Sequence, residues 1–202
     1  MGGRSERMGF PKHELIHRET GSTLWRWHLR KFAHSFSRIL LLSGSQSLNL
    51  SKVSSACEVH LVPDKRGLEG QGPLVALLTA IETCETEWLY FVAVDYPYLS
   101  LEMLSLMGEH KAKGKVIVPE DNSGRAQWLC GLYSVSLMNS LSKVLEQGTR
   151  SMRGFCYDAE TYKIPWSGKL PSKTLNNINT PKQAREAGFE FPDPINTSGR
   201  KS

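Results

Sequence analysis

The first twelve residues carry the densest group of side chains that could do chemistry. Gly2 and Gly3 are adjacent, Arg4 and Arg7 follow, and Lys12 ends the stretch, which contains little apolar surface to bury. Paired glycines let backbone N–H groups approach a ligand closely, and arginine and lysine supply positive charge for phosphate oxygens. The stretch predicts a loop that binds a phosphate-rich ligand. The alternative is a solvated amino-terminal segment of mixed charge.

A second candidate is a carboxylate that follows the most continuous apolar run of the chain. Residues 88–94 read Trp-Leu-Tyr-Phe-Val-Ala-Val, and Asp95 comes directly after them. Open α/β sheets bind ligands outside the carboxyl ends of their strands, and Mg²⁺ takes oxygen ligands from carboxylates, waters and phosphates. Asp95 is therefore a candidate metal ligand. The alternative is a turn or helix-capping aspartate before Pro97.

Two further glycine-containing turns could face an anion. Residues 64–74 run from Asp64 through three glycines to Pro73, which can begin a helix, but they form neither a dinucleotide fingerprint nor a Walker A loop. Residues 148–153, Gly-Thr-Arg-Ser-Met-Arg, form a basic turn, for which the alternative is solvated surface charge. Neither turn by itself is specific evidence for an anion-binding site.

Composition favours a small anionic partner. The 202 residues carry 25 Lys and Arg against 20 Asp and Glu, a net charge of +5, without the blocks of basic charge that a nucleic-acid surface needs. Cys57, Cys84, Cys130 and Cys156 are widely spaced and include no C-x-x-C pair, which indicates reduced thiols in a cytoplasmic protein. No apolar run approaches the roughly 18 residues of a membrane span, so no membrane association is expected.

The elements that must position these residues alternate along the chain. Apolar periodicity predicts helices over residues 23–32, from Pro73, over 101–110, over about 135–146 and from Pro181, with strands at 39–42, 60–63, 88–94, 115–119 and 127–133. This alternation predicts one Rossmann-like domain over residues 1–190, with three layers (α/β/α) and a mostly parallel sheet. Residues 191–202, rich in Pro, Asn, Ser and Gly, are expected to form a disordered tail.

Taken together, these stretches resemble the molybdenum cofactor guanylyltransferases, the MobA-type nucleotidyltransferases. The resemblance extends to about residue 187, and its opening motif is shared with other Rossmann-like nucleotidyltransferases. The closing Asn-Ile-Asn-Thr-Pro narrows the resemblance towards the MobA type. In chain order the matching motifs are Gly2-Gly3-x-Ser5-x-Arg7-Met8-Gly9-x-x-Lys12, Asp64 with Gly72-Pro73-Leu74, Asp95-x-Pro97-x-Leu99, Gly148-x-Arg150-Ser151-Met152-Arg153 and Asn177-Ile178-Asn179-Thr180-Pro181.

The resemblance implies transfer of GMP from GTP to the terminal phosphate of molybdopterin or Mo-molybdopterin, with Mg²⁺ and release of pyrophosphate. It implies that Gly2 and Gly3 cradle phosphates, that Arg7 and Lys12 stabilise the transferring and leaving groups, and that Asp95 holds the metal. Contacts with molybdoenzyme maturation proteins are a further expectation. The remaining implied binding positions are Ser43, Asp64, Gly72, Asn177 and Asn179, with Arg150 and Arg153 near the metal and the pterin phosphate.

Two departures keep other functions open. Ser43 lies where many relatives carry an asparagine after the second strand, and Pro11 replaces the acidic residue common before the lysine. The alternatives are a cytidylyltransferase or another nucleotidyltransferase of the same fold, and a non-catalytic nucleotide-binding maturation factor.

The resemblance also implies an apolar strand ahead of the glycine loop, at the centre of the sheet. The printed sequence starts with Met1 at the glycines, so we expect this form to lack that strand. Its two neighbours would keep unpaired backbone groups, and the core would contain a gap. We expect low stability or weak activity, and a gain in both when about six apolar residues are added.

Overall fold

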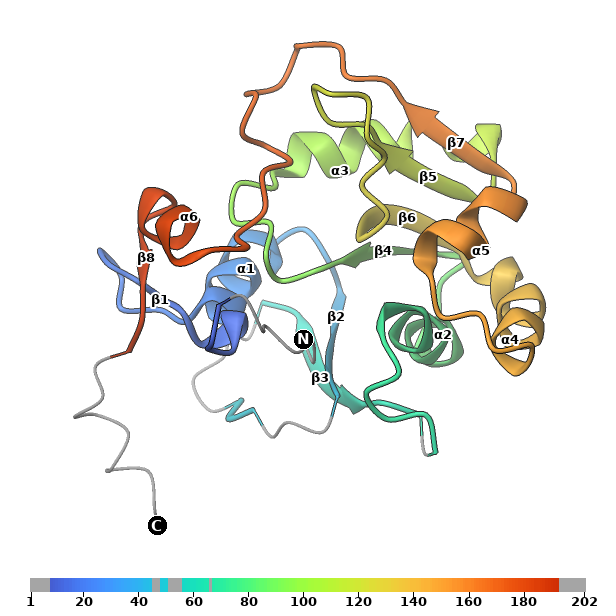
Figure 1. The fold of residues 1–202 in the computed structure, drawn as a ribbon, viewed down its shortest axis with the longest axis horizontal. Helices are drawn as coiled ribbons and strands as arrows, with labels where there is room; N and C mark the ends of the chain where they lie inside the picture. Colours follow the sequence, from blue (N-terminus) through green and yellow to red (C-terminus); the bar gives the residue numbers. More distant parts are fainter. Residues whose placement is uncertain (1–7, 45–47, 51–55, 66, 193–202) are drawn as a thin grey trace.

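The computed structural model describes residues 8–44, 48–50, 56–65 and 67–192 (Figure 1). Gly2, Gly3 and Arg7 lie outside these residues, as does most of the expected tail. The helices are α1 (Leu24–Phe32), α2 (Pro73–Thr83), α3 (Leu101–Gly108), α4 (Met138–Glu146), α5 (Met152–Asp158) and α6 (Pro181–Glu186). The strands are β1 (Ile16–His17), β2 (Arg38–Gly44), β3 (Glu58–Pro63), β4 (Trp88–Val92), β5 (Val116–Pro119), β6 (Cys130–Ser134), β7 (Thr161–Ile164) and β8 (Phe189–Glu190).

The strands form one sheet of four and two separate pairs. The larger sheet has the order β4-β6-β5-β7, in which β6 is antiparallel to both neighbours and β5 is parallel to β7. The strands β2 and β3 form a parallel pair, and β1 and β8 a short antiparallel one. The predicted α/β class is confirmed, and β6 gives the sheet a mixed character.

Local sequence explains where two of the predicted helices begin. Before α2, Gly72 adopts φ +98°, a conformation that suits glycine, and Pro73 occupies the first helical turn. Before α6, the Thr180 hydroxyl accepts a hydrogen bond from the Gln183 amide. Both helix starts were predicted from these residues.

Four of these helices and strands escaped prediction: α5, β7 and the two-residue strands β1 and β8. The helix α5 starts inside the basic turn 148–153, where the Ser151 hydroxyl accepts a hydrogen bond from the Gly154 amide. It has seven residues, too few to show a clear helical period, and the short strand β7 follows directly.

Helices cover both faces of the four-stranded sheet (Figure 1). On one face α2, α4 and α5 pack against Val116, Val118 and Tyr133. On the other face α3 packs against Ile117 and Leu132. The alternation of Val116, Ile117 and Val118 between the two faces is the period of a β-strand, so β5 is buried from both sides.

The strand β4 differs from its neighbours in burial. Every residue of β5 and β6 is buried, whereas every residue of β4 is only half-buried despite its apolar sequence. A cavity of about 990 Å³ lies between β4 and β2. Among the described residues, β4 pairs only with β6 and β2 only with β3.

None of the helices in the described ranges combines the length and the apolar character that a bilayer span requires.

Candidate active site

Three polar side chains from distant parts of the chain meet at the carboxyl end of β4. The Lys12 ammonium donates hydrogen bonds to Asp95 Oδ2 and to Asn179 Oδ1, each over 2.7 Å. Asp95 follows β4, Lys12 begins a short 3₁₀ turn, and Asn179 precedes α6. The side chains of Lys12 and Asp95 are 18% and 17% exposed, so the pair is shielded from solvent but remains accessible to a ligand.

The segment before α6 holds Asn179 in one orientation. Its Nδ2 donates to Asn177 Oδ1 over 2.8 Å, which leaves Oδ1 free to accept from Lys12. Its backbone amide donates to Gln183 Oε1 over 2.8 Å, and the amide of Ile178 donates to the Asp95 carbonyl over 2.8 Å. These bonds attach the predicted Asn-Ile-Asn-Thr-Pro segment directly to the turn that carries Asp95.

Asp64 and Gly72 lie at the two ends of a glycine-rich loop beside the same cavity. Asp64 Oδ2 accepts a hydrogen bond from the Gly70 amide over 2.8 Å and so closes the loop onto itself. Lys12, Asp64, Gly72, Asp95 and Asn179 all line the cavity between β2 and β4. Five of the residues expected at the site are therefore brought to one opening.

Other expected residues lie elsewhere. Arg150 donates to the carbonyls of Leu145 and Thr149, at the end of α4, and to Gln71 Oε1 over 3.0 Å. Its guanidinium therefore holds the 64–72 loop against α4. Arg153 is exposed on α5, and Ser43 is 2% exposed at the end of β2, so neither lines the cavity.

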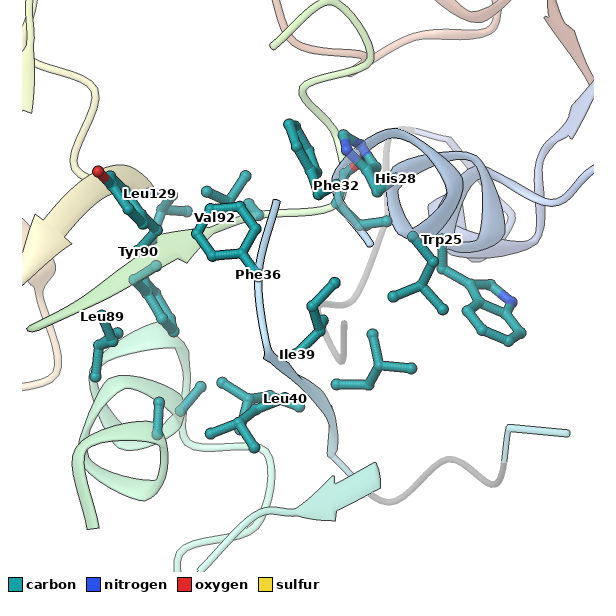
Figure 2. Close-up of a pocket in the computed structure, with 18 of the residues that line it drawn as sticks. Trp25, His28, Phe32, Phe36, Ile39, Leu40, Leu89, Tyr90, Val92 and Leu129 are labelled. Atoms are coloured by element: carbon teal, nitrogen blue, oxygen red, sulfur yellow. The ribbon is translucent and has the colours of Figure 1, made fainter. Parts of the chain in front are cut away.

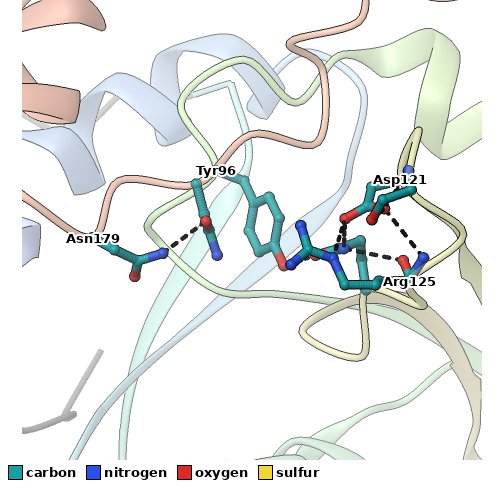
Figure 3. A network of polar contacts seen from close by, with 7 residues as sticks. Tyr96, Asp121, Arg125 and Asn179 are labelled. Carbon is teal, nitrogen blue, oxygen red and sulfur yellow. Dashed lines mark hydrogen bonds and ion pairs between the residues drawn. The ribbon is translucent and has the colours of Figure 1, made fainter.

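A polar network next to Asp95 had no counterpart among the predicted site residues (Figure 3). The buried Tyr96 donates its hydroxyl to Gln127 Oε1 over 3.0 Å, and Gln127 Nε2 donates to Asp121 Oδ2 over 2.9 Å. Sequence analysis could identify residues 120–125 only as a turn, since nothing in their spacing relates them to Asp95.

The network keeps Asp121 ionised. Burial acts to raise the pKa of Asp121, but hydrogen bonds from Ser123 and from the Arg125 backbone outweigh it and lower the pKa to about 2. Burial raises the pKa of Tyr96, which remains a neutral donor. The 119–127 loop is thus fixed against the turn that carries Asp95.

The oxygen donors beside Lys12 suit a hard cation. Asp95 offers a carboxylate and Asn179 an amide oxygen, and the Lys12 ammonium lies between them. Mg²⁺ usually takes one or two protein carboxylates and completes its shell with waters and substrate phosphates. No cluster of three or more His, Cys, Asp or Glu side chains is found in the described ranges. The Asp95 carboxylate and the Asn179 amide oxygen are donors of the kind that Mg²⁺ accepts.

Fold and site together define a class of protein. The cation, carboxylate and amide at the end of β4, with a glycine-rich loop beside them, lie at the carboxyl end of a strand of an α/β fold, which is where such folds bind their ligands. The family model "MobA-like NTP transferase domain" matches residues 1–160, and the chain belongs to this family.

Relatives with curated names agree over most of the chain. The probable molybdenum cofactor guanylyltransferase of Rhodopirellula baltica is 29% identical over 191 residues, covering 89% of this chain and 85% of that protein.

Solved structures share the fold. Molybdopterin-guanine dinucleotide biosynthesis protein A from Archaeoglobus fulgidus superposes with a TM-score of 0.73 at 21% identity, covering 93% of each chain. The 2-C-methyl-D-erythritol 4-phosphate cytidylyltransferase from Thermus thermophilus superposes with a TM-score of 0.60 at 15% identity, covering 88% of this chain and 92% of that one.

Proposed function

We propose that the protein is a molybdenum cofactor guanylyltransferase, which transfers GMP from GTP to the terminal phosphate of molybdopterin or Mo-molybdopterin. The observation that carries this proposal is the contact of Lys12 with both Asp95 and Asn179, from three separate motifs of the family. The name of the Rhodopirellula baltica relative supports the choice of substrates. The proposed enzyme works in the cytoplasm, where molybdoenzyme maturation proteins would take up its product.

The proposed reaction exchanges one phosphoanhydride bond for another. An oxygen of the acceptor phosphate attacks the α-phosphorus of GTP, the bond from that phosphorus to the bridging oxygen breaks, and pyrophosphate leaves with the electron pair. The attacking phosphate is already ionised at neutral pH, so little general-base help is needed. The protein has to hold two anions that repel each other and to neutralise the charge that develops on the leaving group.

Lys12 is the cation that the described site provides for this task. Its ammonium is held by two oxygens, so its position is fixed before substrate binds and little reorganisation accompanies the reaction. Gly2, Gly3 and Arg7 are proposed to add backbone N–H groups and a second positive charge around the same phosphates. Asp64 and Gly72, which line the cavity, are proposed to border the nucleoside, whereas Ser43 is buried at the end of β2 and is left out of this contact.

Asp95 and Asn179 are the residues that would hold Mg²⁺. The metal, when bound, would neutralise the phosphate oxygens and orient them for in-line attack. Asn177 positions Asn179, because its Oδ1 accepts the amide hydrogen and so turns the Asn179 oxygen towards Asp95 and Lys12.

Ser43 favours a second candidate, a cytidylyltransferase acting on the same cofactor. A serine there removes the base contact expected from an asparagine, and the fold is also that of a cytidylyltransferase.

The discriminating experiment supplies the protein with molybdopterin, Mg²⁺ and GTP or CTP labelled at the α-phosphate. The proposal expects label in a dinucleotide product from GTP, with an equal amount of pyrophosphate, and loss of both in Asp95→Asn. Label from CTP alone would establish the second candidate. Nucleotide binding without pyrophosphate release from either nucleotide would favour a non-catalytic maturation factor.

A further inference from the structure

The turn that carries Asp95 is attached to the loop between β5 and β6 through a buried tyrosine. Tyr96 follows Asp95 directly, and only 3% of its surface is exposed. Its ring points from the turn towards this loop (Figure 3), where its hydroxyl lies 3.0 Å from Gln127 Oε1. An amide oxygen only accepts hydrogen bonds, so the tyrosine hydroxyl is the donor. We call this hydrogen bond the tyrosine tether.

The orientation of the Gln127 amide is fixed by two acceptors. Its Nε2 donates to Asp121 Oδ2 over 2.9 Å and to the Arg125 carbonyl over 3.1 Å. The pKa of Asp121 is about 2, so its carboxylate is ionised and, like a carbonyl, has no hydrogen to offer. Both contacts therefore require the amide nitrogen, and the amide oxygen is left facing Tyr96.

The loop that contains Gln127 is closed by its own hydrogen bonds. Asp121 Oδ1 accepts from the Ser123 amide over 2.8 Å, from the Ser123 hydroxyl over 2.6 Å and from the Arg125 amide over 3.1 Å. The Gln127 amide donates to the Pro119 carbonyl over 2.9 Å. Displacing one residue of this loop would break several bonds, so the loop can serve as an anchor for the turn.

We propose that Tyr96 and Gln127 are positioning residues for Asp95, and that the tyrosine tether holds the Asp95 carboxylate in place for a bound divalent cation. Neither side chain lines the cavity at the site, so both act through the turn and not on the substrate. Tyr96 is the unspecified position of the Asp95-x-Pro97 motif, so the resemblance assigns it no role. The role towards the cation rests on the proposed function, whereas the attachment of the turn does not.

Tyr96→Phe tests the tether, because it removes the hydroxyl and retains the buried ring. The matched control is Tyr90→Phe. Tyr90 lies on β4 beside the cavity (Figure 2), and its hydroxyl donates to the Leu104 carbonyl over 2.8 Å. Each variant loses one hydroxyl hydrogen bond, so Tm should fall by about 2–4 °C in both. If Tyr96 only stabilises the fold, the two variants should be alike in every other measurement.

Hydrogen exchange reports on the turn without substrate or metal. The Ile178 amide donates to the Asp95 carbonyl over 2.8 Å, so its exchange rate shows how firmly the turn is held. Relative to the amides of β5, this amide should exchange roughly 5-fold faster in Tyr96→Phe and at the wild-type rate in Tyr90→Phe. Unchanged exchange at Ile178 in Tyr96→Phe would overturn the proposal.

Binding of Mn²⁺ tests the role towards the cation. Mn²⁺ takes the same oxygen ligands as Mg²⁺, and its free concentration can be measured by EPR. With a non-hydrolysable GTP analogue present, the Kd for Mn²⁺ should rise by roughly 10-fold in Tyr96→Phe and stay unchanged in Tyr90→Phe. The same Kd change in both variants, or a change in neither, would contradict the positioning role. Failure of the wild-type complex to bind Mn²⁺ would instead contradict the proposed function, and faster exchange at Ile178 would then still support the tether.

A double variant shows whether the two side chains act through one bond. Gln127→Leu should raise the Kd for Mn²⁺ by a factor similar to that of Tyr96→Phe, and combining the two should add less than about 2-fold. Effects that multiply would show that the residues act independently, which the proposal does not allow. Arg125→Gln is the control for the loop and should leave the Kd unchanged, because the Arg125 side chain is 79% exposed and its ion pair with Asp121 is weak in solvent.

Discussion

Lys12 connects three regions that lie far apart in the chain, because its ammonium binds one oxygen after β4 and another before α6. A lysine held this way has lost its side-chain freedom before any ligand arrives. The side chain that would face the phosphates is therefore pre-organised by protein groups.

Replacing Lys12 should slow turnover strongly while leaving the fold in place. We expect Lys12→Gln to lower kcat/KM for GTP by roughly 100–1,000-fold, the usual effect of removing one group that stabilises developing charge. Pyrophosphate release is the measurement. Lys182→Gln is the control, because Lys182 is exposed on α6 and should leave the rate unchanged. A Lys12→Gln enzyme with normal kcat/KM would remove Lys12 from the proposed mechanism.

Asn177 should act through its neighbour. Asn177→Ala removes the acceptor for the Asn179 amide, so the Asn179 oxygen is no longer held towards Asp95. We expect the Mg²⁺ concentration for half-maximal activity to rise by roughly 10–100-fold, as for groups that orient metal ligands. Asn177→Asp, which retains an acceptor oxygen, should recover most of the loss. Equal Mg²⁺ requirements in the wild type and Asn177→Ala would contradict this role.

At the scale of the element, the start of α6 positions Asn179. The Thr180 hydroxyl accepts from the Gln183 amide, and the Gln183 side chain in turn accepts from the Asn179 amide. The capping of a six-residue helix is thus coupled to the geometry of the site.

Loss of this cap should affect both stability and activity. Thr180→Ala should lower the free energy of unfolding by about 1 kcal/mol, or about 2–4 °C in Tm, and should also lower kcat/KM. Thr180→Ser retains the hydroxyl and should preserve both. Thermal unfolding and pyrophosphate release measured on the same samples provide the check. A decrease in Tm with unchanged kcat/KM would show that the cap stabilises the fold without affecting the geometry of the site.

Most of the long elements could be predicted from the sequence because each has its own local signal. Pro73 and Thr180 mark helix starts, and the apolar run 88–94 marks β4. The helix α5 was missed because it is short, and β6 was not expected to run antiparallel to its neighbours because strand direction depends on packing rather than on local pattern.

The site was predictable as a set of residues but not as a set of contacts. Resemblance selected Lys12, Asp95 and Asn179, yet residues 83 and 167 positions apart meet only through the fold. Arg150 was expected near the ligand, but its guanidinium donates hydrogen bonds to the end of α4 and to Gln71. A sequence motif does not reveal such contacts.

At the scale of the whole molecule, His28 makes stability depend on pH. It lines the cavity between β2 and β4, and its Nε2–H donates to the Val94 carbonyl over 2.9 Å. Burial, followed by the charge of Lys31, lowers the pKa of His28 from 6.5 to about 4. The unfolded chain therefore binds a proton between pH 6.5 and pH 4 that the folded chain does not.

The free energy of unfolding should fall as the pH falls through that interval, by at most about 2 kcal/mol at pH 5. Comparing Tm at pH 7.5 and pH 5 measures the effect. His28→Gln cannot bind the proton and should show a smaller decrease. The exposed residue His34 supplies the control, because the Tm of His34→Gln should decrease between pH 7.5 and pH 5 by as much as that of the wild type. An unchanged pH dependence in His28→Gln would exclude His28 as its source.

The half-buried strand β4 has a consequence for the behaviour of the protein in concentrated solution. Residues 88–94 combine high β-propensity with no charge and no proline, the composition of segments that stack into amyloid, and among the described residues β4 pairs on one edge only, with β6. Such an edge can template the addition of identical segments from other chains. Fibril growth in concentrated solution, followed by thioflavin T fluorescence, should therefore begin at β4.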